Sequence, residues 1–561
     1  MVSFGGTMSK TRNRWLRLLA LVFAFALVAA ACGDSDSDST DAGSDDSGEE
    51  AAPSEGEGEG EGEGVEEDGG LSQDAIEDAM SGDDDDEMAE EEEAEAGDDA
   101  CPSDRSTIEG IWAEADCNRD QIIAMITAEM EAGNWGVNDD NILIGPAGMA
   151  VDLNDCPDDW SDTAGLTDTE IRFGQTTVLS GQLAFYGDLT LGMQIWFGHI
   201  ADIDALSGRE VNMIIRDDGY VAAQTIEFTD ELIESENIFM IQGLGSPNGL
   251  AVYDKINDEC IPHPWYLSGH PAWGDPVNHP WTTAWQMSYS TEAVLWGTWI
   301  KVNLADQLPV KVAGLIMDND FGLAYEDGFH VYAEANPDVV SEFIAVRHDP
   351  AAPTVTNEIT TIQAADPDVF ISMTAGNACV LAIQEVENTG LADTIEAAFT
   401  PSVCQSVGPV MEPAGEASDG WWVVNGGLKD TTDQALQDEP FIKFARQLIS
   451  DAGEDPDISL IGEGIFRGYG FSEALRIADG LPGGLSRTNL LLALRNFKIW
   501  HPGIADGLTL ELRGNEDAYF VEGSGFGQFD FENLTWIEIG DRIDANGGTA
   551  NCAWDKDNGG C

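Results

Sequence analysis

Three short turns in the middle of the chain combine serine hydroxyls with glycines, the residue types that can surround a small anion. They contain Ser180, Ser246 and Ser268, and each directly follows an apolar run. Serine hydroxyls and the free amides at the start of a helix donate hydrogen bonds to groups such as a carboxylate. These turns therefore predict a binding site for an anionic group, with helix capping as the alternative role for Ser246 and Ser268.

Motifs for catalysis and for metal binding are missing from the sequence. It contains no GxSxG, GxxxxGK[ST], CxxC or HExxH, and its seven histidines are scattered. A nucleophile needs a base beside it, and a metal needs a cluster of ligands. We therefore expect no enzyme, no cofactor and no metal. The glycine-rich run at residues 523–527 does not open a helix after a strand, so we interpret it as a turn.

The first serine turn lies inside a strand–helix–strand unit at residues 170–218. The run 171–179 is typical of a strand, and apolar residues then recur at helical spacing at Leu189, Gly192, Trp196 and Ile200. A second strand follows with alternating Val211, Met213 and Ile215. This is the pattern of a βαβ unit. In open parallel sheets the ligand lies beyond the carboxyl ends of the strands, where this turn is placed.

The same α/β pattern continues for about 380 residues, which is too long for one hydrophobic core and suits two lobes. Each lobe is expected to be a parallel sheet flanked by helices. Strands are predicted at 238–241, 312–317, 341–346, 369–373, 395–399 and 421–424, and helices at 249–258, 323–335, 378–389, 439–451, 464–480 and 488–496. Ahead of the lobes, Asn118 is expected to cap a helix that carries Ile122, Ile126 and Met130.

A series of short motifs runs in order through these lobes. They are Leu179-Ser180-Gly181, Tyr186-Gly187, Asp217-Asp218-Gly219-Tyr220, Gly243-Leu244-Gly245-Ser246-Pro247-Asn248, Ser268-Gly269, Trp273-Gly274-Asp275-Pro276 and Pro280-Trp281-Thr282. Together they resemble the type I solute-binding proteins of ABC transporters, in particular the branched-chain amino acid-binding family, over roughly residues 168–545. The resemblance implies a two-lobed type I periplasmic-binding-protein fold. It also implies three hinge crossings, near Thr291, Asn425 and Phe520, and a ligand in the cleft between the lobes.

The resemblance also implies ligand contacts at particular residues. Ser246 and the turn Ser268-Gly269-His270 match the positions that hold a ligand carboxylate and ammonium. Tyr186 matches the aromatic residue that packs over the ligand, and Ser180 lies at the first turn beside it. The second lobe lacks the family's acidic residue at 400–404, so we expect contacts from Asp320, with Asp318 as an alternative, and from Thr374. The ligand is expected to be an amino acid or a related small polar solute, with amides, short peptides, urea-like compounds and aromatic acids left open.

The N-terminus is typical of an exported lipoprotein. Basic residues at 10–17 precede the apolar run 18–28, and three alanines precede Cys32. This layout predicts a signal peptide at 1–31 and a lipid on Cys32, with ordinary secretion and a structural Cys32 as the alternative. Residues 33–99 contain 31 acidic residues and no lysine or arginine. Such a segment cannot form a core, so we expect residues 32–99 to be a disordered tether.

Charge and cysteine content restrict the partners and the compartment. The net charge of −81 argues against binding to nucleic acid or to an anionic membrane surface. Nine cysteines in an exported chain fit one lipid anchor and four disulfides. The spacings predict the pairs Cys101–Cys117, Cys379–Cys404 and Cys552–Cys561, which leaves Cys156 with Cys260.

We therefore expect an extracytoplasmic substrate-binding lipoprotein of an ABC importer, anchored to the outer face of a bacterial membrane. Its partners would be a small solute and the permease and ATPase complex, and it would be a monomer. The alternative is a surface sensor of the same fold. The expected segments are an accessory segment stapled by a disulfide (100–165), lobe 1 (166–291 with 426–520), lobe 2 (292–425 with 521–545) and a C-terminal tail with a local disulfide (546–561).

Overall fold

The computed structural model describes residues 101–554 and Cys561. The predicted signal peptide, the lipid on Cys32 and the acidic tether lie outside the described residues. Within the described part of the chain, no helix is both long and apolar enough to pass through a membrane.

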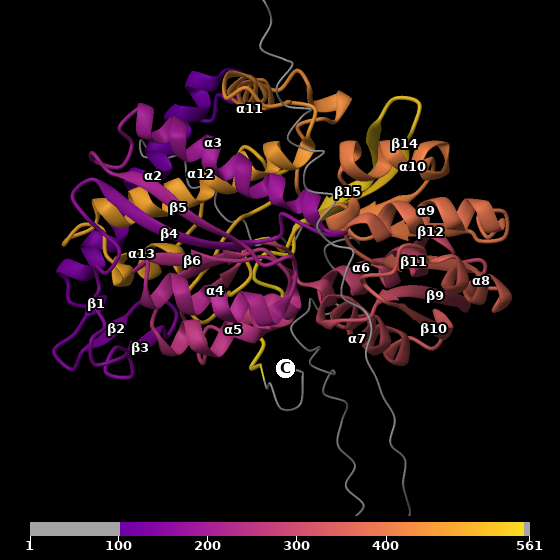
Figure 1. Ribbon diagram of the computed structural model, residues 1–561, viewed down its shortest axis with the longest axis horizontal. Coiled ribbons are helices and arrows are strands. Elements are labelled where there is room, and N and C mark those ends of the chain that lie inside the picture. Colours follow the sequence, from indigo (N-terminus) through magenta and orange to yellow (C-terminus); the bar gives the residue numbers. More distant parts are fainter. Residues whose placement is uncertain (1–100, 555–560) are drawn as a thin grey trace, which may run out of the picture. The chain divides into compact units, whose positions relative to one another are not determined.

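The first lobe is built on a parallel sheet in the order β5-β4-β6 (Figure 1). β4 is buried over most of its length, as expected for a central strand covered by helices on both faces. Hydrogen bonds from Ile241 N to Pro262 O and from Leu267 N to Gly243 O place the parallel pair β7-β8 beside β6. The bounds are β4 Glu170–Thr177, β5 Glu210–Asp217, β6 Met240–Gln242, β7 His263–Tyr266 and β8 Thr282–Ala284.

Two helices of this lobe, α3 and α12, touch through their backbones at glycines. A Cβ atom on Gly192 would collide with the carbonyl oxygen of Ile461, and one on Gly464 would collide with that of Leu189. Only glycine permits so close an approach. The contact fixes the orientation of α12. The helices of the lobe are α3 Gly187–Asp202, α4 Ala222–Glu234, α5 Ser246–Asp258, α11 Pro440–Asp451, α12 Ser459–Gly480 and α13 Arg487–Leu494.

The second lobe contains a seven-stranded sheet in the order β10-β9-β11-β12-β13-β14-β15. The first five strands are parallel, and β14 and β15 pair antiparallel. The strands are β9 Val310–Met317, β10 Val340–His348, β11 Val369–Met373, β12 Ala397–Thr400, β13 Trp422–Val424, β14 Ser524–Asp530 and β15 Thr535–Ile543. Its helices include α6 Tyr289–Asn303, α7 Asp320–Ala335, α8 Thr356–Ala364 and α9 Asn377–Thr389.

The predicted turn at residues 523–527 is wrong, because residues 524–527 lie in strand β14. Gly527 pairs with Val423 of β13 and with Glu538 of β15. Glycine weakens a strand locally, but here two neighbouring strands supply the hydrogen bonds. Pairing with distant segments, rather than local preference, decides the structure of this run.

The chain passes between the two sheets three times: after β8, after β13 and before β14. Asn425 ties two of these crossings together, because its Oδ1 accepts hydrogen bonds from Gly427 N at 2.9 Å and from Gly525 N at 3.1 Å. The mixed α/β architecture with helix-flanked sheets agrees with the predicted two-lobed fold.

The segment before the first lobe packs on that lobe. Helix α2 spans Ile108–Glu131, followed by a small antiparallel sheet of β1 Gly136–Val137, β2 Ile142–Ile144 and β3 Ala150–Asp152. The prediction that Asn118 caps the helix is wrong: the N-cap is Thr107, which accepts from Gly110 N. The ring of Trp112 packs edge-on against Phe444 of α11. Arg119 forms a buried ion pair with Glu473 of α12 at 2.7 Å.

Four disulfides join the cysteine pairs that the spacings predict, Cys101–Cys117, Cys156–Cys260, Cys379–Cys404 and Cys552–Cys561. The Cys156–Cys260 bond connects the N-terminal segment to the end of α5, so it fastens that segment to lobe 1. The other three join residues that are close in sequence or lie within one lobe.

Candidate functional site

A cavity lies where the ends of the two sheets meet, and both lobes line it. The space between its lining atoms measures about 790 Å³, including the part open to solvent. Most of the lining is apolar or aromatic, which is usual for a small-molecule site. The apolar part includes Leu183, Leu189, Leu267, Met287 and Leu460 from one side, and Phe321, Ala375 and Val403 from the other.

The only charged residues among the described residues that line this cavity are Glu463 and Arg467, one turn apart on α12. Arg467 donates from both Nε and Nη2 to Oε1 of Glu463, with an Nε–Oε1 distance of 3.1 Å. The Arg467 side chain is 2% exposed and that of Glu463 is 19% exposed. The guanidinium carbon lies 5.5 Å from the centre of the Trp285 ring, which also lines the cavity.

Tyr186 joins the two lobes at the edge of the cavity. It follows the first serine turn, at the start of α3, and its hydroxyl donates to Val403 O at 3.0 Å. The same hydroxyl accepts from Gly376 N at 3.3 Å. Burial raises the pKa of Tyr186 above its ordinary value, so the hydroxyl stays protonated and can donate. Tyr186 is therefore a cavity residue, as the resemblance implies, and also a contact between the lobes.

Glu292 on α6 holds the second-lobe loop that faces the cavity. Its carboxylate accepts from Ser402 N at 2.6 Å, from Ser402 Oγ at 2.8 Å and from the Tyr325 hydroxyl at 2.7 Å. Ser402 is one of the lining residues. Burial raises the pKa of Glu292 to about 7, although these three hydrogen bonds oppose the shift. The loop is therefore fixed by a carboxyl group that titrates near neutral pH.

The second and third serine turns lie behind the cavity wall. Ser246 and Ser268 are fully buried, and their hydroxyls bind each other at 2.8 Å. Ser268 also accepts from His270 N at 3.1 Å. The neighbouring Gly245 and Leu267 line the cavity, but these two serines and Gly269 do not belong to the lining. The Ser268 side chain also hydrogen-bonds to Tyr289 of α6, which does line the cavity.

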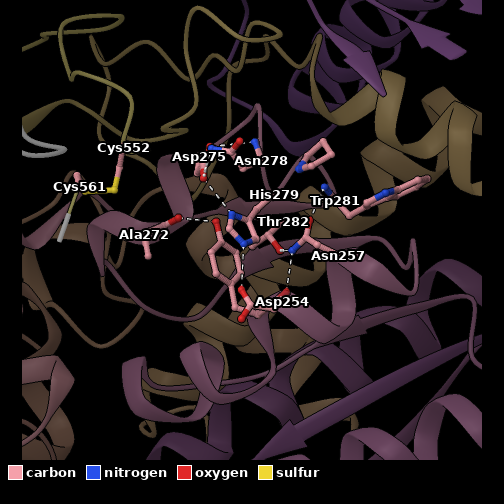
Figure 2. Close-up of polar contacts among 12 residues, drawn as sticks. Asp254, Asn257, Ala272, Asp275, Asn278, His279, Trp281, Thr282, Cys552 and Cys561 are labelled. Atoms are coloured by element: carbon pink, nitrogen blue, oxygen red, sulfur yellow. Dashed lines mark hydrogen bonds and ion pairs between the residues drawn. A yellow bond between two sulfur atoms is a disulfide. The ribbon is translucent and has the colours of Figure 1, made fainter. Parts of the chain in front are cut away.

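His270 and the segment after it form a packed, hydrogen-bonded region of lobe 1. Nδ1 of His270 accepts from Ala272 N at 3.2 Å, and burial lowers the pKa of His270 to about 3, so the ring is neutral. Figure 2 shows the polar contacts next to it, where His279 lies between Asp275 at 3.0 Å and Asp254 at 3.2 Å. His270 does not line the cavity. These contacts are internal to the region, so its side chains have a structural role here.

The remaining predicted contacts also lie outside the lining. Ser180 is exposed and hydrogen-bonds to Asp217, which also accepts from Leu179 N at 2.8 Å. Asp320 is the first residue of α7 and partly buried, and desolvation raises its pKa. Thr374 is buried, with its hydroxyl 2.8 Å from that of Ser372. Of the eight predicted ligand contacts, the structure brings Tyr186 to the cavity.

Sequence reasoning missed the polar residues that do line the cavity, above all Glu463 and Arg467. One signal was available: over Leu460–Phe471 these two are the only charged residues, in a run that is otherwise apolar or glycine-rich. A carboxylate and a guanidinium four residues apart pair on one helix face. A pair inside an apolar helix points to burial and so to a specific role.

Comparisons with known proteins identify the family. The family model described as periplasmic binding protein matches residues 170–521, more than half of the chain. No curated protein matches the sequence. Solved structures with the same fold include a branched-chain amino acid ABC transporter protein from Thermus thermophilus with bound valine (15% identity, TM-score 0.58, covering 68% of this chain and 97% of that one).

Two further solved structures have different ligands in their descriptions. One is a solute-binding protein of an ABC transporter from Rhodopseudomonas palustris HaA2 in complex with p-hydroxybenzoic acid (16% identity, TM-score 0.56, covering 67% of this chain and 98% of that one). The other is a fatty acid ABC transporter substrate-binding protein from Thermomonospora curvata (16% identity, TM-score 0.57, covering 70% and 97%). At these identities the likeness establishes the fold.

Proposed function

The chain belongs to the periplasmic binding protein family, and on that premise we propose that it captures a small solute for an ABC importer. The solute is an amino acid or a related compound with an apolar body, and it binds in the cavity between the lobes. The protein hands the solute to a permease and ATPase complex and catalyses no reaction. It acts as a monomer outside the cell membrane, held there by a lipid on Cys32.

One observation carries the proposal: a largely apolar cavity with a single charged pair, lined by both lobes at the ends of their sheets. Two lobes joined by three crossings can open and close around such a space by hinge bending. The Tyr186 contacts to Val403 and Gly376 supply a specific interaction between the lobes at the edge of the cavity. A site of this kind suits binding and release better than chemistry.

The related structures support the range of solutes. Their descriptions name valine, p-hydroxybenzoic acid and fatty acid. All three ligands combine a carboxyl group with an apolar body. This chain's cavity offers the same combination of an apolar wall and a polar pair, so we place its solute in the same broad group.

A thermal-shift screen of the full chain tests the proposal. The panel should contain amino acids, amides, aromatic acids and fatty acids. A solute that binds only the native state stabilises it by about 2.7 kcal/mol at a concentration 100 times its Kd, so at least one member should raise the melting temperature clearly. If every member leaves the melting temperature unchanged at millimolar concentration, the proposed function is wrong.

A further inference from the structure

Two buried hydrogen-bond donors at the cavity have no acceptor. Nη1 of Arg467 and Nε1 of Trp285 are closed off from solvent and have no hydrogen-bond partner among the described residues. Both residues line the cavity, and the Arg467 guanidinium lies over the Trp285 ring. A buried donor without a partner is costly, and a charged one especially so. Both donors therefore need a hydrogen-bond acceptor, such as a carboxylate oxygen.

An acceptor is also left unused beside them. Arg467 binds only Oε1 of Glu463, and no hydrogen bond to Oε2 is formed within the described residues. The Glu463 side chain is partly exposed and lines the cavity. The α12 pair, which we define as Glu463 and Arg467, thus presents a free donor edge and a free acceptor edge next to each other.

Charge balance decides which ligand suits the α12 pair. The pair is neutral as a whole, so a bound monoanion would leave one net negative charge in a mostly apolar cavity, which is unfavourable. The protein's net charge of −81 adds repulsion for an anion. A zwitterion adds no net charge and can satisfy both edges at once. Its carboxylate meets Arg467 and Trp285, while its ammonium meets Glu463.

We propose that the α12 pair, together with Trp285, recognises the ammonium and carboxylate of an α-amino acid with an apolar side chain. The inference rests on the proposed function, since it concerns the same cavity. It moves the recognition of the charged groups from the serine turns to α12. The apolar side chain of the ligand then lies against Leu183, Leu189, Phe321 and Val403, which line the same space.

Matched probes test the ligand class on the full chain by titration calorimetry. L-leucine is compared with isocaproate, which lacks the ammonium, and with isopentylamine, which lacks the carboxylate. L-phenylalanine is compared in the same way with hydrocinnamate and phenethylamine. At least one of the two amino acids should bind, and at least ten times more tightly than either of its analogues, because each analogue leaves one edge of the pair unsatisfied.

Three variants test the residues. Arg467→Lys keeps the charge beside Glu463 but removes the free Nη1, Trp285→Phe keeps a ring but removes Nε1, and Glu463→Gln removes the negative charge. Arg467→Lys and Glu463→Gln each remove a hydrogen bond to a charged group, so each should lower the affinity for the amino acid roughly 10- to 150-fold. Arg476→Lys is the matched control on the same helix, because Arg476 pairs with Glu473 and does not line the cavity.

The outcomes separate this inference from the proposed function. Leucine or phenylalanine binding that is lost in Glu463→Gln and Arg467→Lys, but kept in Arg476→Lys, supports it. Amino-acid affinity within twofold of wild type in both variants, or equal affinity for isocaproate and leucine, overturns it while solute capture stands. If Arg467→Lys does not fold, the amino-acid affinities of Glu463→Gln and Trp285→Phe decide between these outcomes. If neither amino acid binds while another member of the thermal-shift panel does, the inference is also overturned and the function is kept.

Discussion

The contact between the lobes through Tyr186 makes a prediction that can be worked out from the structure. The variant Tyr186→Phe keeps the aromatic ring, which packs against Phe185 with ring centres 4.5 Å apart. It removes only the hydroxyl that donates to Val403 O at 3.0 Å and accepts from Gly376 N at 3.3 Å. We call the arrangement in which the lobes touch through these contacts the closed arrangement, and the change acts on it more than on the shape of the cavity.

The expected size follows from the two hydrogen bonds. Each contributes a net 0.5–1.5 kcal/mol, so their loss should disfavour the closed arrangement by about 1–3 kcal/mol. Since the affinity of a ligand falls with the fraction of protein in the binding-competent state, the apparent Kd should rise roughly 5- to 150-fold. The effect should be the same for any solute that the closed cavity holds.

Titration calorimetry of wild type and Tyr186→Phe with a solute found by the thermal-shift screen measures this difference. Tyr253→Phe is the matched control, because its buried hydroxyl donates to Ala272 O within lobe 1. The control should lower the melting temperature but keep the affinity. If Tyr186→Phe binds within twofold of wild type, the contact does not support the closed state and the reasoning is refuted.

Three other predictions concern the pH dependence of stability, the Cys156–Cys260 disulfide and the lipid on Cys32. Burial raises the pKa of Glu292 from 4.5 to about 7, so its contribution to the free energy of unfolding is greatest below about pH 4.5 and falls by on the order of 3 kcal/mol as the pH rises through 7. Melting curves should show this loss in wild type but not in Glu292→Gln, and parallel pH profiles of the two proteins would contradict it. Replacing Cys156 and Cys260 by alanine removes a disulfide that spans 104 residues, and the loss of this loop constraint should lower the free energy of unfolding by up to about 4.7 kcal/mol. An unchanged denaturant unfolding curve would show that this disulfide does not stabilise the fold. Cys32→Ser should release the protein from the detergent phase, whereas partitioning like wild type would disprove the lipid anchor.

Regular elements with local signals were predictable from the sequence. The strand at Val369–Met373 was predicted with the bounds that β11 has. The helix predicted at 439–451 is α11, Pro440–Asp451, whose apolar residues recur on one face. In both, the period of the apolar residues reflects the burial of one face or of the whole strand. The local sequence therefore contains most of the information about these elements.

Elements that depend on distant partners were not predictable in this way. Strand β14 contains two glycines and turn-like local preferences, and it exists because β13 and β15 pair with it. Asparagine is a good N-cap residue, so the sequence favours a helix start at Asn118. The helix instead begins a full three turns earlier at Ile108, where Trp112 packs onto α11.

The candidate site also contains one residue that could be predicted from the sequence and others that could not. Tyr186 could be found because it precedes a predicted helix and matches, by resemblance, the aromatic residue that packs over the ligand. The apolar residues around the α12 pair indicate that it is buried, but they do not place it at the cavity. Its position at the cavity depends on the glycine contact between α3 and α12, where Gly192 and Gly464 meet. Only the folded chain reveals that contact.

The central claim is that a solute binds in the cavity between the lobes, and a blocked cavity tests it most directly. Gln405 lines the cavity, is partly exposed, and its side chain forms no hydrogen bond within the described residues. Gln405→Trp should therefore fill the space without disturbing the fold. Titration calorimetry with the solute that raises the melting temperature most should give saturable binding of one molecule per chain in wild type and no saturable heat in Gln405→Trp. Equal heats in the two proteins, with equal melting temperatures in the absence of solute, would show that the solute binds elsewhere.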